Sequence, residues 1–409
     1  MRSHYCIRFL AIISCLTLII LTGCQSPANL EPSSIKKVDT VSPQPTELSP
    51  QETSNSLNKL DIFLKNLSQT EQIPLNTLKE AYYDVKPQLG ARKLVSPPPS
   101  GAKKNWRAHR ALFIENIRLQ TGVRFWRENR TFLEKTEKET GVPIEVIVGI
   151  LGIETMYGSN MGNFNVRDVL ATLAFNYPES PNKESRESMF RQQLADLTIY
   201  CWKESAQNSK PNQFNNCLKQ TSSFAGAIGM PQFMPTSIRK FAVDGDGDGI
   251  INLRSSKEDA IASVANFMVG HGWRKNEPIF LELSSQEKAI EAAKALADGD
   301  PDPKYTLASL KQRGIVDSWK KPLTDDSLAL VVDLPTNEKN GTSYVEYVVG
   351  LKNFEVITLY NRSFFYAKVV TDFGYEVGKR VRESTVVENK PSAKAGAPKH
   401  RKTKKKNRS

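Results

Sequence analysis

The chain has 409 residues, 39% of them hydrophobic and 24% charged, and a formal net charge of +12 at pH 7. Residues 390–409 hold nine Lys or Arg and no acid, so without those nine the other 389 residues carry only +3. The basicity is therefore mainly a property of the tail, which excludes a strongly cationic nucleic-acid-binding core. About 320 residues remain between the two terminal segments, enough for a sizeable core or for two or three small lobes.

Residues 1–23 have the features of a lipoprotein signal peptide. Arg2 and Arg8 precede a thirteen-residue apolar run, Phe9 to Leu21, which is shorter than the ~20 residues of a membrane-spanning helix. The run ends in Leu21-Thr-Gly-Cys24, which resembles the bacterial lipobox. We expect acyl chains on Cys24 to hold the mature chain on a membrane. The alternative is a plain secretory signal with an incidental cysteine.

Residues 24–58 are rich in Pro, Ser and Thr and predict a flexible tether. Apolar residues at spacings of three and four then predict helices over 59–88, 112–140, 143–157, 185–206, 257–271 and 285–297. Aliphatic, β-branched and aromatic residues predict strands over 328–333, 345–348 and 364–371. The pattern indicates an α+β class that is mainly helical, with a small sheet late in the chain.

The helix predicted over 143–157 carries a carboxylate, Glu154, on its apolar face. Ile147, Ile150 and Leu151 share this face, because they precede Glu154 by seven, four and three residues. Burying an ionised carboxylate costs several kcal/mol, so the pKa of Glu154 should rise until the group holds its proton near neutrality. Such a group suits general acid catalysis. The alternative is a structural carboxylate, paired with an Arg or with backbone N–H groups.

Three of the five cysteines lie within residues 1–24, which leaves Cys201 and Cys217, sixteen positions apart. In an oxidising compartment these two favour a disulfide that closes the intervening loop. A metal site there is not expected, since no His or further Cys stands at ligand spacing.

The segment Asp244-Gly-Asp-Gly-Asp-Gly-Ile-Ile-Asn252 matches the opening of an EF-hand calcium loop. The expected ligands are the carboxylates of Asp244, Asp246 and Asp248 and the carbonyl of Ile250. Ser255 stands at the twelfth position, where a bidentate Glu is usual, so a longer loop would have to bring in Glu258 or Asp259. The alternative is an acidic turn that binds no metal.

Four motifs follow one another between residues 105 and 375. They are Glu-Thr-x-Tyr-Gly from Glu154, then Asp168 to Pro178, then Gly226-Ala-Ile-Gly-Met-Pro-Gln-Phe-Met-Pro235, and finally Tyr360-Asn-Arg-Ser-Phe-Phe-Tyr-Ala367. Together they resemble the membrane-bound lytic murein transglycosylase B family, the lysozyme-like lytic transglycosylases of family 3. The resemblance implies a lysozyme-like core flanked by a helical lobe and a small β lobe.

The resemblance also implies a division of the chain. The expected parts are a signal peptide (1–23), a tether (24–58), a first part of the helical lobe (59–140), a catalytic core with the EF-hand-like loop (141–272), a second part of the helical lobe (273–342), a β lobe (343–388) and a disordered basic tail (389–409).

A lone carboxylate fits the chemistry that this family implies. Most glycosidases use two carboxylates, whereas a lytic transglycosylase needs one, because the C6 hydroxyl of the substrate is the nucleophile. Glu154 would protonate the oxygen between N-acetylmuramic acid and N-acetylglucosamine and then accept the C6 proton as the 1,6-anhydro ring closes. Asp168, the next acidic residue along the chain, lies in a segment whose pattern indicates a structural role in packing. No cofactor is expected for this reaction, and calcium is expected only as a structural ion.

The resemblance carries further site residues, motif by motif. Ser223 would hold Glu154, and Gln232, Tyr360, Asn361 and Tyr366 would line the substrate cleft. Asp259 is the favoured closing ligand of the calcium loop. Three positions depart from the family pattern: His109 and Phe267 stand where Tyr is usual, and Leu359 where Arg is common. These departures bear on substrate contacts, and His109 is retained as a substrate-binding candidate.

The expected partners are peptidoglycan glycan strands, a membrane through the lipid anchor, and an anionic polymer through the basic tail, but no nucleic acid. Gln25 after Cys24 favours an outer-membrane lipoprotein on the periplasmic face. Two other functions stay open: a muramidase that hydrolyses the same bond, and a non-catalytic wall-binding lipoprotein in which Glu154 is structural.

Overall fold

The computed structural model describes residues 48–96, 104–207, 212–338 and 341–388. The helices are α1 (Pro50–Glu71), α2 (Leu75–Tyr82), α3 (Leu89–Leu94), α4 (Trp106–Phe113), α5 (Asn116–Glu128), α6 (Arg130–Thr140), α7 (Ile144–Thr155), α8 (Val166–Phe175), α9 (Lys183–Gln207), α10 (Gln213–Leu218), α11 (Pro235–Phe241), α12 (Lys257–Gly270), α13 (Glu287–Leu296), α14 (Leu307–Gln312), α15 (Lys352–Tyr360) and α16 (Phe364–Glu388). The strands are β1 (Phe164–Asn165), β2 (Thr221–Ser222), β3 (Phe280–Glu282), β4 (Tyr305–Thr306), β5 (Leu328–Asn337) and β6 (Ser343–Gly350).

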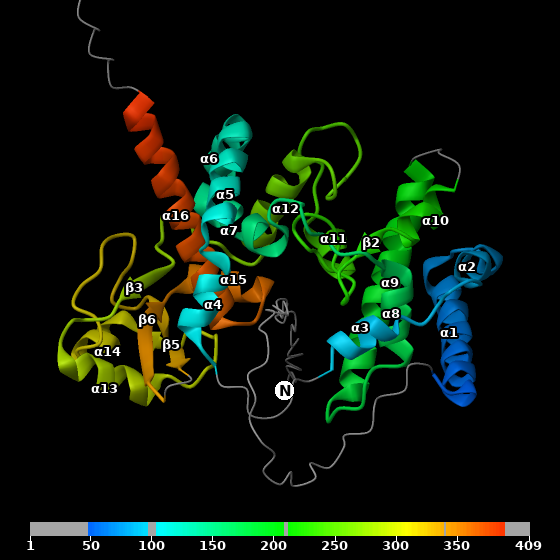
Figure 1. The fold of residues 1–409 in the computed structure, drawn as a ribbon, viewed down its shortest axis with the longest axis horizontal. Coiled ribbons are helices and arrows are strands. Elements are labelled where there is room, and N and C mark those ends of the chain that lie inside the picture. Colours follow the sequence, from blue (N-terminus) through cyan, green and yellow to red (C-terminus); the bar gives the residue numbers. More distant parts are fainter. Residues whose placement is uncertain (1–47, 97–103, 208–211, 339–340, 389–409) are drawn as a thin grey trace, which may run out of the picture.

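The elements gather in three regions, as Figure 1 shows. In this view α1–α3 and α8–α10 lie on the right, and the sheet with α13 and α14 lies at the lower left. Helices α4–α7 and α16 lie above the sheet, and α11 and α12 lie between them and α8–α10. The sheet has the order β3-β6-β5-β4 and every neighbouring pair is antiparallel. The chain is thus mainly helical with small antiparallel sheets, which confirms the predicted fold class.

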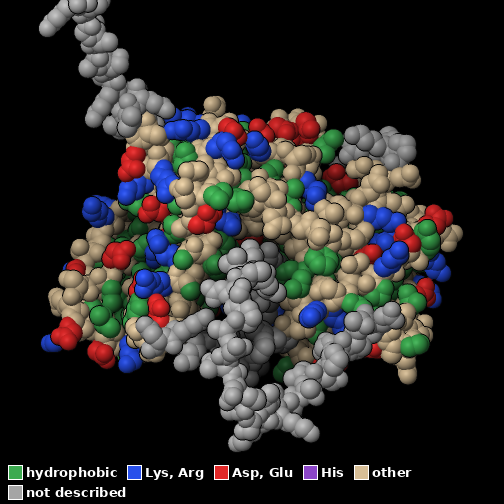
Figure 2. All heavy atoms as spheres, viewed as in Figure 1, with side chains coloured by type: hydrophobic (Ala, Val, Ile, Leu, Met, Phe, Trp, Pro, Cys, Tyr) green, Lys and Arg blue, Asp and Glu red, His purple; other side chains and the backbone are tan. Residues whose placement is uncertain are grey.

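Two hydrophobic cores hold these regions together. The larger core runs from α1 through α7 and α12 to α16, and the smaller core lies under the sheet, where α13 and α14 pack on β5 and β6. On the face drawn in Figure 2, acidic and basic side chains of the described residues alternate without separating by sign. Among the described residues, no helix has both the length and the apolar character that crossing a bilayer requires.

The strand predicted over residues 364–371 is wrong, because this segment begins α16. Its aromatic and β-branched residues belong to a longer helical stripe. The buried residues of that stripe are Tyr366, Val370, Phe373, Val377 and Val381. The buried residues recur at spacings of three and four over fifteen positions, which is typical of a helix, whereas the first eight residues of the segment alone resemble a buried strand.

The predicted tether ends too late in the sequence, since α1 begins at Pro50. Ser49 and Glu52 form a capping box, in which the Ser49 hydroxyl accepts from the Glu52 N–H and the Glu52 carboxylate accepts from the Ser49 N–H.

The predicted helix 59–88 is broken after α1, where Gln72 has a left-handed backbone and Pro74 precedes α2. The predicted helix 112–140 divides into the end of α4, α5 and α6. Strands β3, β4 and β5 precede residue 343, within the segment assigned to the helical lobe.

Helices α7 and α16 cross closely at the centre of the molecule. A Cβ on Gly149 of α7 would lie 2.5 Å from the carbonyl oxygen of Val370, and one on Gly374 of α16 would lie 1.9 Å from that of Glu145. Only glycine permits these approaches. The crossing brings the C-terminal end of α7 beside the first turn of α16.

Candidate active site

Glu154 lies in the last turn of α7, as its predicted helix requires. Ile147, Ile150 and Leu151 are fully buried on the same helix, whereas Glu154 stays partly exposed at the helix end. The three residues after Thr155, the last residue of α7, are Met156, Tyr157 and Gly158, and all have positive φ angles, which end the helix abruptly. Backbone of this kind is costly for Met and Tyr and concentrates at functional sites.

Burial raises the pKa of the Glu154 carboxyl to about 7, against a smaller opposing effect from a hydrogen bond with Tyr366. The Tyr366 hydroxyl donates to Oε1 of Glu154 over 2.6 Å. Tyr366 is itself buried and stacks on Tyr360, with ring centroids 6.2 Å apart, and the Tyr360 hydroxyl donates to the carbonyl of Pro231. The acid is therefore held from α16 and kept half-protonated near neutral pH.

Glu154 faces a cleft of about 340 Å³. The cleft-lining residues are His109, Phe113, Arg118, Ile153, Glu154, Thr155, Met156, Asn160, Gly162, Asn163, Phe164, Ser223, Phe224, Gln232, Asn361, Tyr366 and Val369. Among these described residues Glu154 is the sole carboxylate. Asp168 does not line the cleft and is paired instead with the buried guanidinium of Arg167, 2.8 Å away.

The glycine-rich segment 226–235 forms one wall of the cleft. Gln232 lines the cleft with a positive φ, and its amide donates to the carbonyl of Gly229 over 2.9 Å. Ser223 also lines the cleft, but the expected hydrogen bond to Glu154 is not made. Its hydroxyl oxygen accepts from the N–H groups of Ala225 and Ala227, which fixes the turn instead. Tyr366 makes the bond to Glu154 that we predicted for Ser223.

Of the three residues that depart from the family pattern, only His109 lines the cleft. Its Nε2 atom is buried without a hydrogen-bond partner, and burial lowers the pKa of its ring. Phe267 does not line the cleft but packs in the core against His271 and Tyr360, with ring centroids 4.1 and 4.8 Å away. Leu359 lies on α15 and is not among the cleft-lining residues.

Four polar residues of the cleft were not predicted from the sequence: Arg118, Thr155, Asn160 and Asn163. Arg118 on α5 enters the cleft beside Phe113, and its Nη1 donates to the carbonyl of Gly152 in α7 over 2.7 Å. Thr155, next to Glu154, donates to the carbonyl of Met230 over 2.8 Å and so ties α7 to the glycine-rich wall. The Glu-Thr-x-Tyr-Gly motif contained the signal for Thr155, whereas Arg118 follows no motif.

The acidic loop brings Asp259 to Asp244 and Asp246, with one carboxylate oxygen of each within 4.8 Å of the others. Asp259 is fully buried, and its two oxygens accept from the N–H groups of Gly245 and Asn252 over 2.8 and 2.6 Å. Asp248 and Ile250 lie in the same loop, but the Asp248 carboxylate lies outside this cluster. A buried carboxylate facing two others fits a hard cation such as calcium.

Cys201 and Cys217 are joined by a disulfide between α9 and α10. The predicted signal peptide, Cys24 and the basic tail lie outside the described residues.

Comparisons with known proteins identify similar sequences. The sequence profile of the transglycosylase SLT domain matches residues 57–375. The membrane-bound lytic murein transglycosylase B of Escherichia coli (strain K12) is 37% identical over 280 residues, which cover 68% of this chain and 69% of that protein.

Two solved structures are also similar. The soluble lytic transglycosylase SltB1 of Pseudomonas aeruginosa is 34% identical with a TM-score of 0.66, over 79% of this chain and 99% of that one. The Escherichia coli lytic transglycosylase Slt35 in complex with calcium is 32% identical with a TM-score of 0.65, over 80% of this chain and 94% of that one.

Proposed function

We infer the chemistry of the cleft from the premise that this chain belongs to the transglycosylase SLT domain family. It is a lytic transglycosylase, a lyase that cleaves peptidoglycan. Breaking a glycosidic bond requires a proton donor for the leaving oxygen, and the cleft has to supply that donor.

We propose that Glu154 serves first as general acid and then as general base. In the first step its proton passes to the oxygen between N-acetylmuramic acid and N-acetylglucosamine as the bond from that oxygen to C1 breaks. In the second step the Glu154 carboxylate accepts the proton of the C6 hydroxyl, whose oxygen bonds to C1 and closes a 1,6-anhydro ring. No water enters and the residue ends protonated as it began.

The observation that carries this proposal is that Glu154 is the sole carboxylate among the described cleft residues, with its pKa raised to about 7. A pKa near the working pH lets one group both give and take a proton. An inverting hydrolase needs a second carboxylate roughly 6.5–9.5 Å away to activate water, and a retaining one needs a nucleophile at about 5–5.5 Å. Neither partner lines the cleft in the described part of the chain.

The other cleft residues have supporting roles in this proposal. Tyr366 orients the acid, and Tyr360 supports Tyr366 from behind. Gln232 and Asn361 offer amide groups to sugar hydroxyls and acetamido groups, and Ser223 fixes the wall on which Gln232 stands. His109 also lines the cleft and offers its ring to the substrate.

The test is digestion of purified peptidoglycan by the wild type and by Glu154→Gln, with mass analysis of the product ends. We expect 1,6-anhydro-muramoyl ends from the wild type and a loss at or above the ~10² to 10⁴-fold typical of a positioned acid–base group for the variant. Reducing muramic acid ends from the wild type would identify a hydrolysing muramidase. Full activity of the variant would remove Glu154 from the mechanism.

We also propose that the acidic loop binds calcium as a structural ion. Asp244, Asp246 and Asp259 would hold it, with Asp248 and the carbonyl of Ile250 as further ligands at the loop surface. Bound calcium would supply charge neutralisation within the loop and no step of the reaction. Support for a link to the cleft comes from the end of the loop, where the Leu253 carbonyl accepts from the Met230 N–H over 2.8 Å. Met230 in turn accepts the hydrogen bond of Thr155, beside Glu154.

The sequence supports a location on the periplasmic face of a membrane, as an outer-membrane lipoprotein anchored through Cys24. The E. coli relative is named membrane-bound. The basic tail would add contacts with an anionic polymer of the wall. Cys24→Ser should release active enzyme into the soluble periplasmic fraction, because acyl chains supply the anchoring free energy. Sedimentation of the variant with membranes would show that Cys24 is not the anchor.

A further inference from the structure

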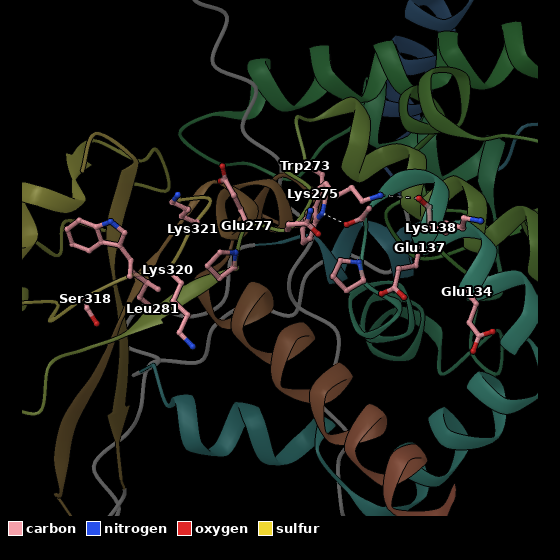
Figure 3. Close-up of a pocket in the computed structure, with 15 residues that line it drawn as sticks. Glu134, Glu137, Lys138, Trp273, Lys275, Glu277, Leu281, Ser318, Lys320 and Lys321 are labelled. Carbon is pink, nitrogen blue, oxygen red and sulfur yellow. Dashed lines mark hydrogen bonds between the residues drawn. The ribbon is translucent and has the colours of Figure 1, made fainter. Parts of the chain in front are cut away.

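A second groove lies at the opposite end of α7 from Glu154. It has a volume of about 760 Å³ and is formed by the α6–α7 connection, residues 273–281 and residues 318–321 beside the sheet (Figure 3). Pro143 lines it at the start of α7, and Glu154 follows eleven residues later, roughly 16 Å along the helix axis at 1.5 Å per residue. The groove shares no lining residue with the catalytic cleft.

The unbalanced charge in this groove is positive. Lys138, Lys275, Lys320 and Lys321 line it, and we name it the lysine groove after these four. In the described part of the chain none of the four forms an ion pair, and Lys275 donates only to the carbonyl of Lys138. Figure 3 shows Lys320 and Lys321 on the sheet side and Lys138 on the α6 side.

The three glutamates of the groove, by contrast, already have partners. Glu134 pairs with Arg130 over 2.7 Å. Glu137 accepts from the N–H of Ile144 over 3.1 Å. Glu277 pairs with Arg274 over 3.4 Å. A ligand would therefore meet lysines that lack acidic partners and acids that are occupied, which favours an anionic ligand.

The floor of the groove is apolar and aromatic. The Trp273 indole donates to the carbonyl of Gly141 over 2.9 Å, which fixes its ring against the α6–α7 connection. Trp319 stays partly exposed, and Leu281 also lines the groove. Rigid rings beside cationic side chains suit a short chain that has both an apolar and an anionic part.

We propose that the lysine groove binds the peptide stems of peptidoglycan through their carboxylates, an inference that rests on the proposed substrate. In this polymer the sugars are uncharged where a peptide is attached, so free carboxylates lie on the peptides. A stem of three to five residues spans roughly 10–18 Å when extended, at 3.3–3.6 Å per residue, and fits a groove of this volume.

The position of the groove determines what such binding does. Because the groove lies roughly 16 Å from Glu154 along α7, the carboxylates bound there are remote from the bond being cut. Their stem is attached at the cut repeat and fully extended, or it belongs to another repeat or a neighbouring strand, and holding it raises the effective concentration of glycan at the cleft. The lysine groove would then make the enzyme prefer wall that still carries its peptides.

The experiment uses two soluble probes from one wall preparation: stem peptides released by an amidase, and the peptide-free glycan left behind. Each is titrated by NMR into the Glu154→Gln protein, which leaves the glycan intact. Lys320→Glu with Lys321→Glu is compared with Lys288→Glu with Lys294→Glu, which makes the same charge change on exposed lysines of α13, outside the groove.

We expect saturable binding of the stem peptides, at least ~10-fold weaker in the groove variant and unchanged in the α13 variant, and weaker again at high salt. Equal binding by the two variants, binding of the peptide-free glycan alone, or no saturation with either probe up to ~10 mM would overturn the proposal. The binding measurement is independent of cleavage. A failure of the proposed chemistry would appear in the products of the wild type and leave this titration interpretable.

Discussion

Replacing Tyr366 by Phe should raise the pKa of Glu154 and move the activity profile to higher pH. In the structure burial raises this pKa to about 7, and the hydrogen bond from the Tyr366 hydroxyl opposes that rise. The hydroxyl stabilises the carboxylate and not the acid, so its removal favours the protonated form. The Phe ring keeps the packing of α16 against Tyr360.

The size of the shift depends on the strength of the bond. A hydrogen bond to a charged group contributes about 1.5–3 kcal/mol, and one pKa unit corresponds to about 1.36 kcal/mol. Loss of the bond should therefore raise the pKa by roughly one to two units. At neutral pH nearly all molecules would then hold the proton, and the step in which Glu154 donates its proton would become slower, because a higher pKa makes the group a weaker acid.

The assay is the rate of anhydro-product formation from pH 5 to pH 10, together with the carboxyl chemical shift of Glu154 in labelled protein. Tyr360→Phe is the matched control, because the Tyr360 hydroxyl donates to the Pro231 carbonyl and not to Glu154. It should leave the pKa of Glu154 close to the wild-type value. An unchanged or lowered pKa in Tyr366→Phe would refute the reasoning about how this acid is held.

Three further predictions concern stability. Millimolar calcium should raise the melting temperature, by an amount equivalent to about 2.7 kcal/mol at a hundredfold excess over Kd, and Asp246→Ala should abolish this response. Identical melting curves with chelator and with calcium would show that the loop binds no metal. Gly149→Ala should lower the free energy of unfolding, measured with denaturant, by ~1–3 kcal/mol and should lower turnover, because its Cβ would lie 2.5 Å from the Val370 carbonyl oxygen. Gly90→Ala is the control: its Cβ would lie 3.6 Å from its closest contact, so its stability should be close to that of the wild type. Between pH 4.5, the ordinary pKa of a glutamate, and about 7 the unfolded chain ionises Glu154 while the folded protein keeps the proton, so wild-type stability falls as pH rises. Glu154→Gln lacks this contribution, and melts across that range should show a shallower loss.

The position of Glu154 was predictable from the sequence because helical periodicity is local. Ile147, Ile150 and Leu151 are enough to place Glu154 on the inner face of α7, and the structure buries all three. The acidic loop was predictable for the same reason, since its aspartates alternate within five residues. The choice of Asp259 over Glu258 needed the family resemblance, because it depends on where α12 begins.

What the sequence did not reveal depends on contacts between distant segments. Residues 364–371 resemble a strand when read alone, and only the stripe that continues to Val381 makes them a helix. The role given to Ser223 belongs to Tyr366 because the crossing of α7 and α16 decides which hydroxyl reaches Glu154. That crossing depends on Gly149 and Gly374, which no pattern in either segment connects.

The bond from Tyr366 to Glu154 joins residues that are 212 positions apart in the chain. Contacts of such separation form late in folding, because a long loop must close before they add stability. A nascent or truncated chain that ends before α16 would carry the acid but neither the hydroxyl that holds it nor the helix that buries it. If Glu154 acts as proposed, the ability to cut the wall therefore arises only when nearly the whole described chain has folded.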